Sequence, residues 1–192
     1  ADLALFLETE DYSIDLRSPN WRSDDTGRLL YWDSLDGNHI PREQIEGGNL
    51  PGVEDNWAAI RIEGRGLTLL ADLVRSHALF YARDNGRWVV SDSPQAIKER
   101  LGHWRLDAQA SEVFKLTGFT FNEKTLIDGV SVVEAASSVS LLHGEQQADI
   151  TFWGVPLYGS QQVQDPEEFS QLYGRAVRQT FSTLLRRTGE RQ

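Results

Sequence analysis

The chain of 192 residues contains neither cysteine nor methionine. Without cysteine it can form no disulfide and no thiolate metal site, and it offers no thiol nucleophile. Since a natural reading frame normally begins with methionine, we expect either that an initiator was removed or that the chain is a piece of a longer protein.

Long apolar runs and an excess of basic residues are also missing. No stretch of 18 apolar residues occurs, and no basic segment followed by an apolar one stands at the start, so the sequence predicts neither a membrane span nor a secretory signal. Lysine and arginine number 19 against 29 acidic residues, and the formal net charge of −10 disfavours binding to phosphate backbones. We therefore expect a cytoplasmic protein whose partners include neither nucleic acid nor membrane.

Short apolar segments separated by turn residues predict strands. Two hairpins are indicated, one around Glu63–Gly66 and one around Arg83–Gly86, which contains the hairpin dipeptide Asn-Gly. We expect their four strands to be consecutive and antiparallel. The predicted strands are 3–8, 28–32, 57–62, 67–72, 78–82, 87–91, 130–133, 139–142 and 150–153.

Two helices are predicted between these groups of strands. Ser93 followed by Pro94 is typical of a helix start, and this helix is expected to reach Leu101. Asp107 can cap a second helix that Gly118 ends, with its apolar residues at helical spacing. Strands, then helices, then strands indicate an α+β fold rather than a parallel α/β sheet.

The last part of the chain predicts a separate element. Residues 158–164 are a polar linker, and Asp165 and Pro166 begin a helix. Its apolar residues from Phe169 to Leu185 recur at 3.6-residue spacing, so one face must pack on something. We expect a domain over 1–157, followed by a linker and helix over 158–192 that lead to a further domain.

Five segments carry a family pattern in a fixed order. They are ADLVRSHALFYA at 71–82, VVSDSPQAI at 89–97, LDAQASEVFKLTGF at 106–119, TLIDGVSVV at 125–133 and ITFW at 150–153. Together they resemble the N-terminal, class II glutamine amidotransferase domain of the asparagine synthetase family. The resemblance implies a four-layer αββα sandwich of the N-terminal-nucleophile (Ntn) hydrolase type, with two antiparallel sheets.

In the resembled family a terminal cysteine hydrolyses glutamine and supplies ammonia to a synthetase domain. The mechanism needs the nucleophile and a free α-amino group on one residue. Here that residue is Ala1, which has neither sulfur nor hydroxyl, and the hydroxyls of Thr9, Tyr12 and Ser13 carry no α-amino group. The sequence therefore predicts no catalytic residue.

Two residues are candidates for binding a substrate. Arg28, in GRLLYWDSLDG, resembles the family's carboxylate-binding arginine, although an exposed arginine at a strand start is the alternative. Asp72 lies at a strand end that would approach the catalytic centre, although a structural bond to a neighbouring backbone amide is favoured. His39, His77, His103 and His143 lack ligand spacing, so no metal site is predicted.

These observations predict a non-catalytic glutaminase-like domain of an asparagine synthetase-related, ATP-dependent amide-forming ligase. Its role would be structural, toward the C-terminal synthetase domain of the same chain. ATP and Mg²⁺ are implied for that parent and no cofactor for this piece. Two alternatives stay open: a glutamine-hydrolysing asparagine synthetase domain whose nucleophile was lost, which a cysteine at position 1 would revive, and a non-enzymatic binding module. The oligomeric state, including a homo-oligomer, is also left open.

Overall fold

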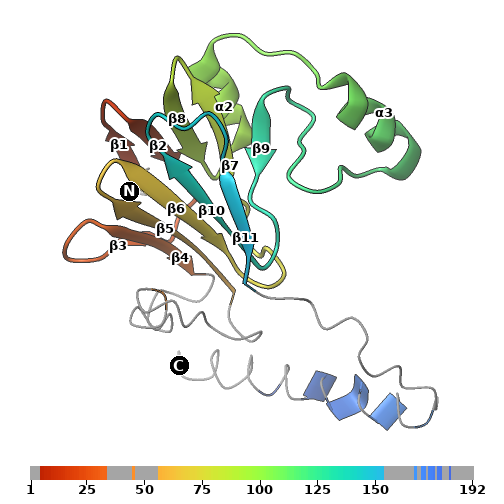
Figure 1. Ribbon diagram of the computed structural model, residues 1–192. Coiled ribbons are helices and arrows are strands. Elements are labelled where there is room, and N and C mark those ends of the chain that lie inside the picture. Colours follow the sequence, from red (N-terminus) through yellow and green to blue (C-terminus); the bar gives the residue numbers. More distant parts are fainter. Residues whose placement is uncertain are drawn as a thin grey trace. The chain divides into compact units, whose positions relative to one another are not determined.

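The structure is a computed structural model that describes residues 5–33, 45 and 56–153, together with residues 167, 170–171, 173–175, 177–178 and 182. The chain divides into two compact units, Ala1–Gly154 and Val155–Gln192. Within the described residues, the first unit contains two β-sheets and the helices α2 and α3 (Figure 1). No helix among the described residues is long and apolar enough to cross a membrane.

One sheet has five strands in the order β1-β2-β8-β7-β9. Their bounds are β1 Leu5–Glu8, β2 Tyr12–Leu16, β8 Arg87–Ser91, β7 Phe80–Asp84 and β9 Val130–Val132. Neighbouring strands run antiparallel except at the centre, where β2 pairs with β8 in parallel. The sequence-based expectation of two wholly antiparallel sheets is wrong at this pair.

The second sheet has six strands in the order β11-β10-β6-β5-β4-β3, and every neighbouring pair is antiparallel. The bounds are β11 Asp149–Phe152, β10 Ser137–Leu142, β6 Gly66–Ala71, β5 Trp57–Glu63, β4 Leu29–Asp33 and β3 Trp21–Ser23.

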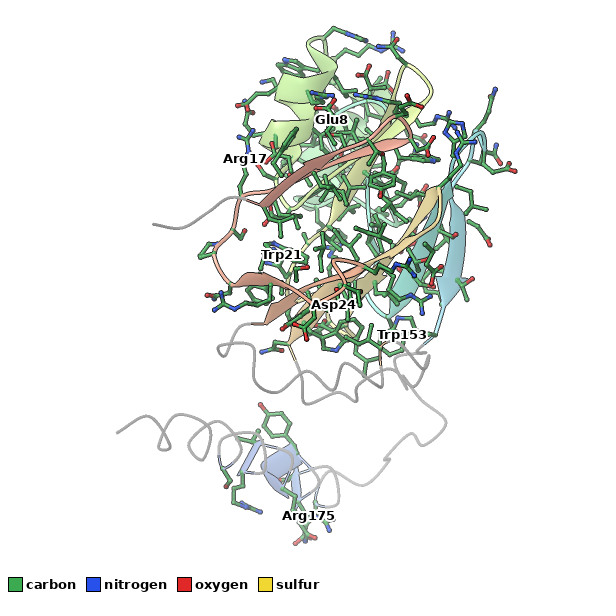
Figure 2. All side chains as sticks on the ribbon, turned by 90° about the vertical axis from the view of Figure 1, so that its left-hand side faces the viewer. Glu8, Arg17, Trp21, Asp24, Trp153 and Arg175 are labelled. Atoms are coloured by element: carbon green, nitrogen blue, oxygen red, sulfur yellow. The ribbon has the colours of Figure 1, made fainter. Side chains whose placement is uncertain are left out.

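The two sheets pack face to face around one apolar core. Alternate residues of each strand point to the same face, so that β2 contributes Ile14 and Leu16 to this core while β6 contributes Leu67 and Leu69. All four side chains are at most 1% exposed. Side chains fill the space between the sheets (Figure 2), which makes this unit a sandwich.

Each outer face of the sandwich carries its own apolar cluster. Helix α2 (Pro94–Leu101) places Ile97 on Ala82, Val89 and Val130 of the five-stranded sheet. The other outer face has a cluster whose members are Leu29, Tyr31, Ile45, Trp57, Ala59 and Leu70, with Trp153 packed against it. The described residue Ile45 is helical and fully buried there.

Helix α3 (Ala108–Thr117) differs from α2 because it is not buried against a sheet. Asp107 caps its start, and Gly118, with a φ of 78°, ends it. Only Ala110 of this helix is buried. Figure 1 shows the helix in a segment that projects away from both sheets.

The local predictions hold better than the topology. Helix α2 keeps its predicted start and end, Asp107 and Gly118 cap α3 as predicted, and Asn85 and Gly86 have the positive φ angles of 49° and 85° that their turn requires. The two predicted hairpins form, but they lie in different sheets and are not four consecutive strands of one sheet. Strands β2 and β3 were not predicted.

The second unit is described at scattered positions only. All of its described residues are helical, and Tyr173 is 62% exposed. Of the predicted apolar stripe, Phe169, Leu172, Ala176, Thr180, Phe181, Leu184 and Leu185 lie outside the described residues, as do the predicted linker 158–164 and the cap at Asp165 and Pro166.

Candidate functional site

A buried carboxylate, that of Asp92, lies directly after β8. Its side chain is fully buried. One oxygen, Oδ1, accepts the backbone N–H of Arg17 at 2.8 Å, while Oδ2 accepts the backbone N–H of Ser18 and the indole N–H of Trp21, each at 2.9 Å. The parallel pairing explains the contact: it sets Asp15 beside Ser91, so the next residues of both strands meet.

His77 adds a fourth contact to the same carboxylate. It lies in the connection between β6 and β7, and its Nε2 is 3.3 Å from Asp92 Oδ2. The imidazole ring stacks on Trp32, with centroids 4.1 Å apart and planes at 11°, and meets Trp21 edge-on at 5.7 Å. We call Asp92, His77, Trp21 and Trp32 the Asp92 cluster. It connects the two sheets, because Trp21 and Trp32 belong to the six-stranded sheet and Asp92 follows a strand of the other.

The surroundings of Asp92 keep it ionised. Burial alone would raise the pKa of this carboxyl, but hydrogen bonds from His77, from the Arg17 amide and from Ser18 outweigh burial and hold the pKa well below its usual range. A carboxylate has about four lone-pair sites. Three N–H donors and the His77 nitrogen contact its two oxygens, and the side chain is fully buried, so Asp92 is not accessible to a substrate proton.

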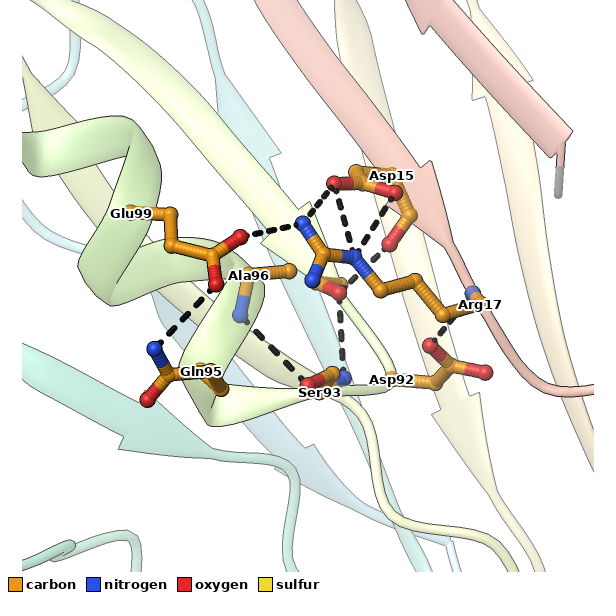
Figure 3. A network of polar contacts seen from close by, with 8 residues as sticks. Asp15, Arg17, Asp92, Ser93, Gln95, Ala96 and Glu99 are labelled. Carbon is orange, nitrogen blue, oxygen red and sulfur yellow. Dashed lines mark hydrogen bonds and ion pairs between the residues drawn. The ribbon is translucent and has the colours of Figure 1, made fainter.

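A second network joins β2 to helix α2 beside the cluster (Figure 3). The Arg17 guanidinium donates to Asp15 at 3.0 Å and to Glu99 at 2.7 Å, and these two bonds raise its pKa. Ser91 donates its hydroxyl to the Asp15 carbonyl. Because Arg17 and Glu99 are 41% and 51% exposed, solvent screens this ion pair and it contributes little to stability.

Asp72, a candidate from the sequence, directly follows β6 and is 1% exposed. Its Oδ2 accepts the Trp57 amide at 2.9 Å, and its Oδ1 accepts the amides of Val74 and Ser76 at 2.9 and 3.0 Å. Its carbonyl accepts the Ala136 amide at 2.8 Å. These are the backbone bonds that the structural interpretation of Asp72 predicts, and they turn the chain where it leaves the six-stranded sheet.

Arg28, the other candidate, is exposed and directly precedes β4. It lines an open hollow of about 480 Å³ together with Asp24 and Arg61. Its carbonyl accepts the Ile62 amide at one end of β5, whereas Asp72 bonds Trp57 at the other end. Five residues of strand separate these contacts by about 17 Å, so the structure does not bring Arg28 and Asp72 together.

The Asp92 cluster was not found from the sequence. In the sequence, Asp92 is one residue of a family-like segment, and His77 is one of four histidines without ligand spacing. No motif of fixed residue spacing indicates the cluster, because it joins residues that lie up to 71 positions apart. Among the described residues, no group of three or more histidine, aspartate or glutamate side chains could hold a metal ion.

Comparison with known proteins adds no assignment. No protein-family model and no curated protein sequence matches the chain.

Proposed function

We propose that the chain is a non-catalytic, glutaminase-like domain of an asparagine synthetase-related, ATP-dependent ligase, and that it stabilises or orients the amide-forming domain of that ligase. We also propose that the sandwich is of the Ntn-hydrolase type. The layer order supports this fold, since α2 lies on one outer face and the helical residue Ile45 is buried on the other. ATP and Mg²⁺ would act in the ligase domain.

The observation that carries the proposal is the state of the two buried carboxylates in the family-like segments. Asp72 accepts three backbone amides, and Asp92 accepts two backbone amides and an indole N–H. Both therefore hold the ends of strands in place. A general base must reach the reacting group to accept its proton, and these two carboxylates are buried and bonded to the protein's own N–H groups.

An exposed apolar surface supports a docking role. On α3 and the segment after it, Phe114 is 42% exposed, Leu116 86%, Phe119 53% and Phe121 50%, and the last two rings meet edge-on at 4.9 Å. Exposed apolar patches mark surfaces that bind other proteins or ligands. A domain that serves a neighbouring domain needs such a surface.

The proposal is tested by incubating the protein with glutamine and measuring glutamate release. We expect no turnover from the protein as it stands, because Ala1 has no nucleophile. We also expect none from an Ala1→Cys variant with a free terminus, because the two candidate substrate-binding residues, Arg28 and Asp72, do not lie together. Sustained turnover by the unmodified protein would refute the proposal that the domain is non-catalytic. Turnover by Ala1→Cys alone would favour the second candidate, a glutaminase that has lost its nucleophile.

The docking role is tested separately in the full-length ligase, by its ATP–pyrophosphate exchange rate. We expect Phe119→Ser on the apolar surface to lower the rate, while Phe152→Ser, which alters an equally exposed ring on β11, leaves it unchanged. Equal rates in both variants would refute docking through this surface.

A further inference from the structure

A hollow of about 420 Å³ opens where the β7–β8 hairpin of one sheet meets the β10–β11 hairpin of the other. It contains Trp88 and therefore lies toward the opposite end of β8 from Asp92. Its size falls within the range of small-molecule sites, about 300–1,000 Å³. Its polar lining residues are Tyr81, Arg83, Glu123, Ser131, Gln146 and Gln147.

Arg83 supplies an uncompensated positive charge. Its guanidinium lies 4.9 Å above the Trp88 ring, and Nη2 donates to the Gly86 carbonyl at 2.7 Å. The Nη1 atom is buried without a hydrogen-bond partner, and no carboxylate in the described part of the chain forms an ion pair with Arg83. A buried donor without an acceptor is destabilising, and a ligand carboxylate beside the guanidinium would offset that cost.

Glu123 supplies a negative charge in the same hollow. Within the described residues its carboxylate has neither an ion pair nor a side-chain hydrogen bond. Its charge reaches its neighbours: burial raises the pKa of Glu134, and Glu123 raises it further. The pKa of Tyr81 is likewise raised by burial, with a smaller contribution from Glu123, although a hydrogen bond with Ser131 opposes the shift.

We propose that this hollow binds a free α-amino acid in its zwitterionic form. The carboxylate would meet the Arg83 guanidinium, whose parallel N–H groups match a carboxylate, and the ammonium would meet Glu123. Tyr81, Ser131 and the two glutamines provide neutral donors and acceptors for a polar side chain. Opposite charges in one hollow discriminate against simple anions and simple cations, since each would meet one like charge. This site is independent of the proposed docking role.

The test is a binding titration of the whole chain with the standard L-amino acids, each up to millimolar concentration, by ligand-detected NMR and then calorimetry. We expect saturable binding of at least one amino acid. The analogue of that amino acid without the amino group, and the analogue without the carboxylate, should each bind at least about tenfold more weakly.

Two variants locate the site. Arg83→Gln and Glu123→Gln should each weaken binding at least about tenfold, whereas Glu145→Gln, in the neighbouring turn, should leave it unchanged. Thermal unfolding checks that each variant is folded, and if Arg83→Gln is not, Glu123→Gln alone decides. Absence of binding by every amino acid, unchanged binding in the folded variants, or equal binding of an analogue that lacks one charge would each overturn the proposal.

Discussion

Replacing Asp92 by asparagine tests whether the Asp92 cluster holds the two sheets together. The substitution keeps the shape of the side chain but leaves one oxygen as acceptor and puts an NH₂ group where the other oxygen was. If the NH₂ group takes the Oδ1 position, it faces the N–H of Arg17. If it takes the Oδ2 position, it faces the N–H groups of Ser18 and Trp21 and the ring nitrogen of His77. At least one buried donor therefore loses its acceptor.

The magnitude follows from these contacts. One buried donor without an acceptor costs about 1–3 kcal/mol, and the lost bonds to an ionised group are each worth about 1.5–3 kcal/mol. We expect Asp92→Asn to lower the free energy of unfolding by about 2–4 kcal/mol. For a domain of this size each kcal/mol corresponds to about 2–4 °C in Tm, so 3 kcal/mol corresponds to about 6–12 °C.

The assay is urea unfolding at neutral pH, with Asp25→Asn as the matched control, because Asp25 is an exposed carboxylate. The control should change the free energy of unfolding by less than about 0.5 kcal/mol. An Asp92→Asn protein as stable as the control would refute the structural role of the cluster.

The pH dependence gives a second readout of the same group. The folded-state pKa of Asp92 is lowered, so its contribution to stability is complete above the unfolded-state value of about 3.9 and is lost as the pH falls below that value toward the folded-state pKa. The stability difference between the unmodified protein and Asp92→Asn should thus shrink below about pH 4. A difference that stays constant down to pH 2 would contradict this linkage.

Three further predictions use the same unfolding measurement. Asp72→Asn should lower the free energy of unfolding by about 1–3 kcal/mol, because at least one of the three bonded amides loses its acceptor; an unchanged free energy of unfolding would show that these bonds do not stabilise the turn. Arg75 has a φ of 54°, which is strained for a residue with a Cβ atom, and its side chain is exposed. Arg75→Gly should therefore raise the free energy of unfolding by about 0.5–1 kcal/mol. A lower free energy of unfolding would show that the backbone at Arg75 is not strained. Leu116→Lys should change stability by less than about 0.5 kcal/mol, whereas Ile60→Ala in the core should cost about 2–5 kcal/mol; a large loss at Leu116 would mean that α3 is packed.

The features predicted from the sequence are those that local chemistry determines. Ser93 accepts the Ala96 amide and Asp107 the Ala110 amide, so each helix start is specified within four residues. Asn85 and Gly86 can both adopt the positive φ that a tight turn requires. These signals needed no knowledge of the rest of the chain, which explains why the limits of α2 were predicted correctly.

The features that the sequence did not predict depend on distant parts of the chain. A strand's own residues do not say which strand will pair with it, and the parallel contact between β2 and β8 joins residues about 76 positions apart. The β3 strand has only three residues, too few for an alternating pattern. The Asp92 cluster exists because that pairing brings Ser18 and Trp21 to the end of β8. A sequence pattern that does not reveal the pairing cannot reveal the cluster.

The two ends of β8 differ in the roles that we propose for the charged groups near them. Directly after the carboxyl end of β8, Asp92 is an ionised group that is fully buried and bonded to the protein's own N–H groups. Its removal should therefore lower stability, and it is not accessible to a ligand. Near the other end of the strand, the hollow contains Arg83 and Glu123, two charged groups without an ion-pair partner among the described residues. A structural carboxylate should therefore affect unfolding and not binding, and an unsatisfied pair should affect binding and not unfolding. Measuring both properties for Asp92→Asn and Glu123→Gln separates the two roles within one sandwich.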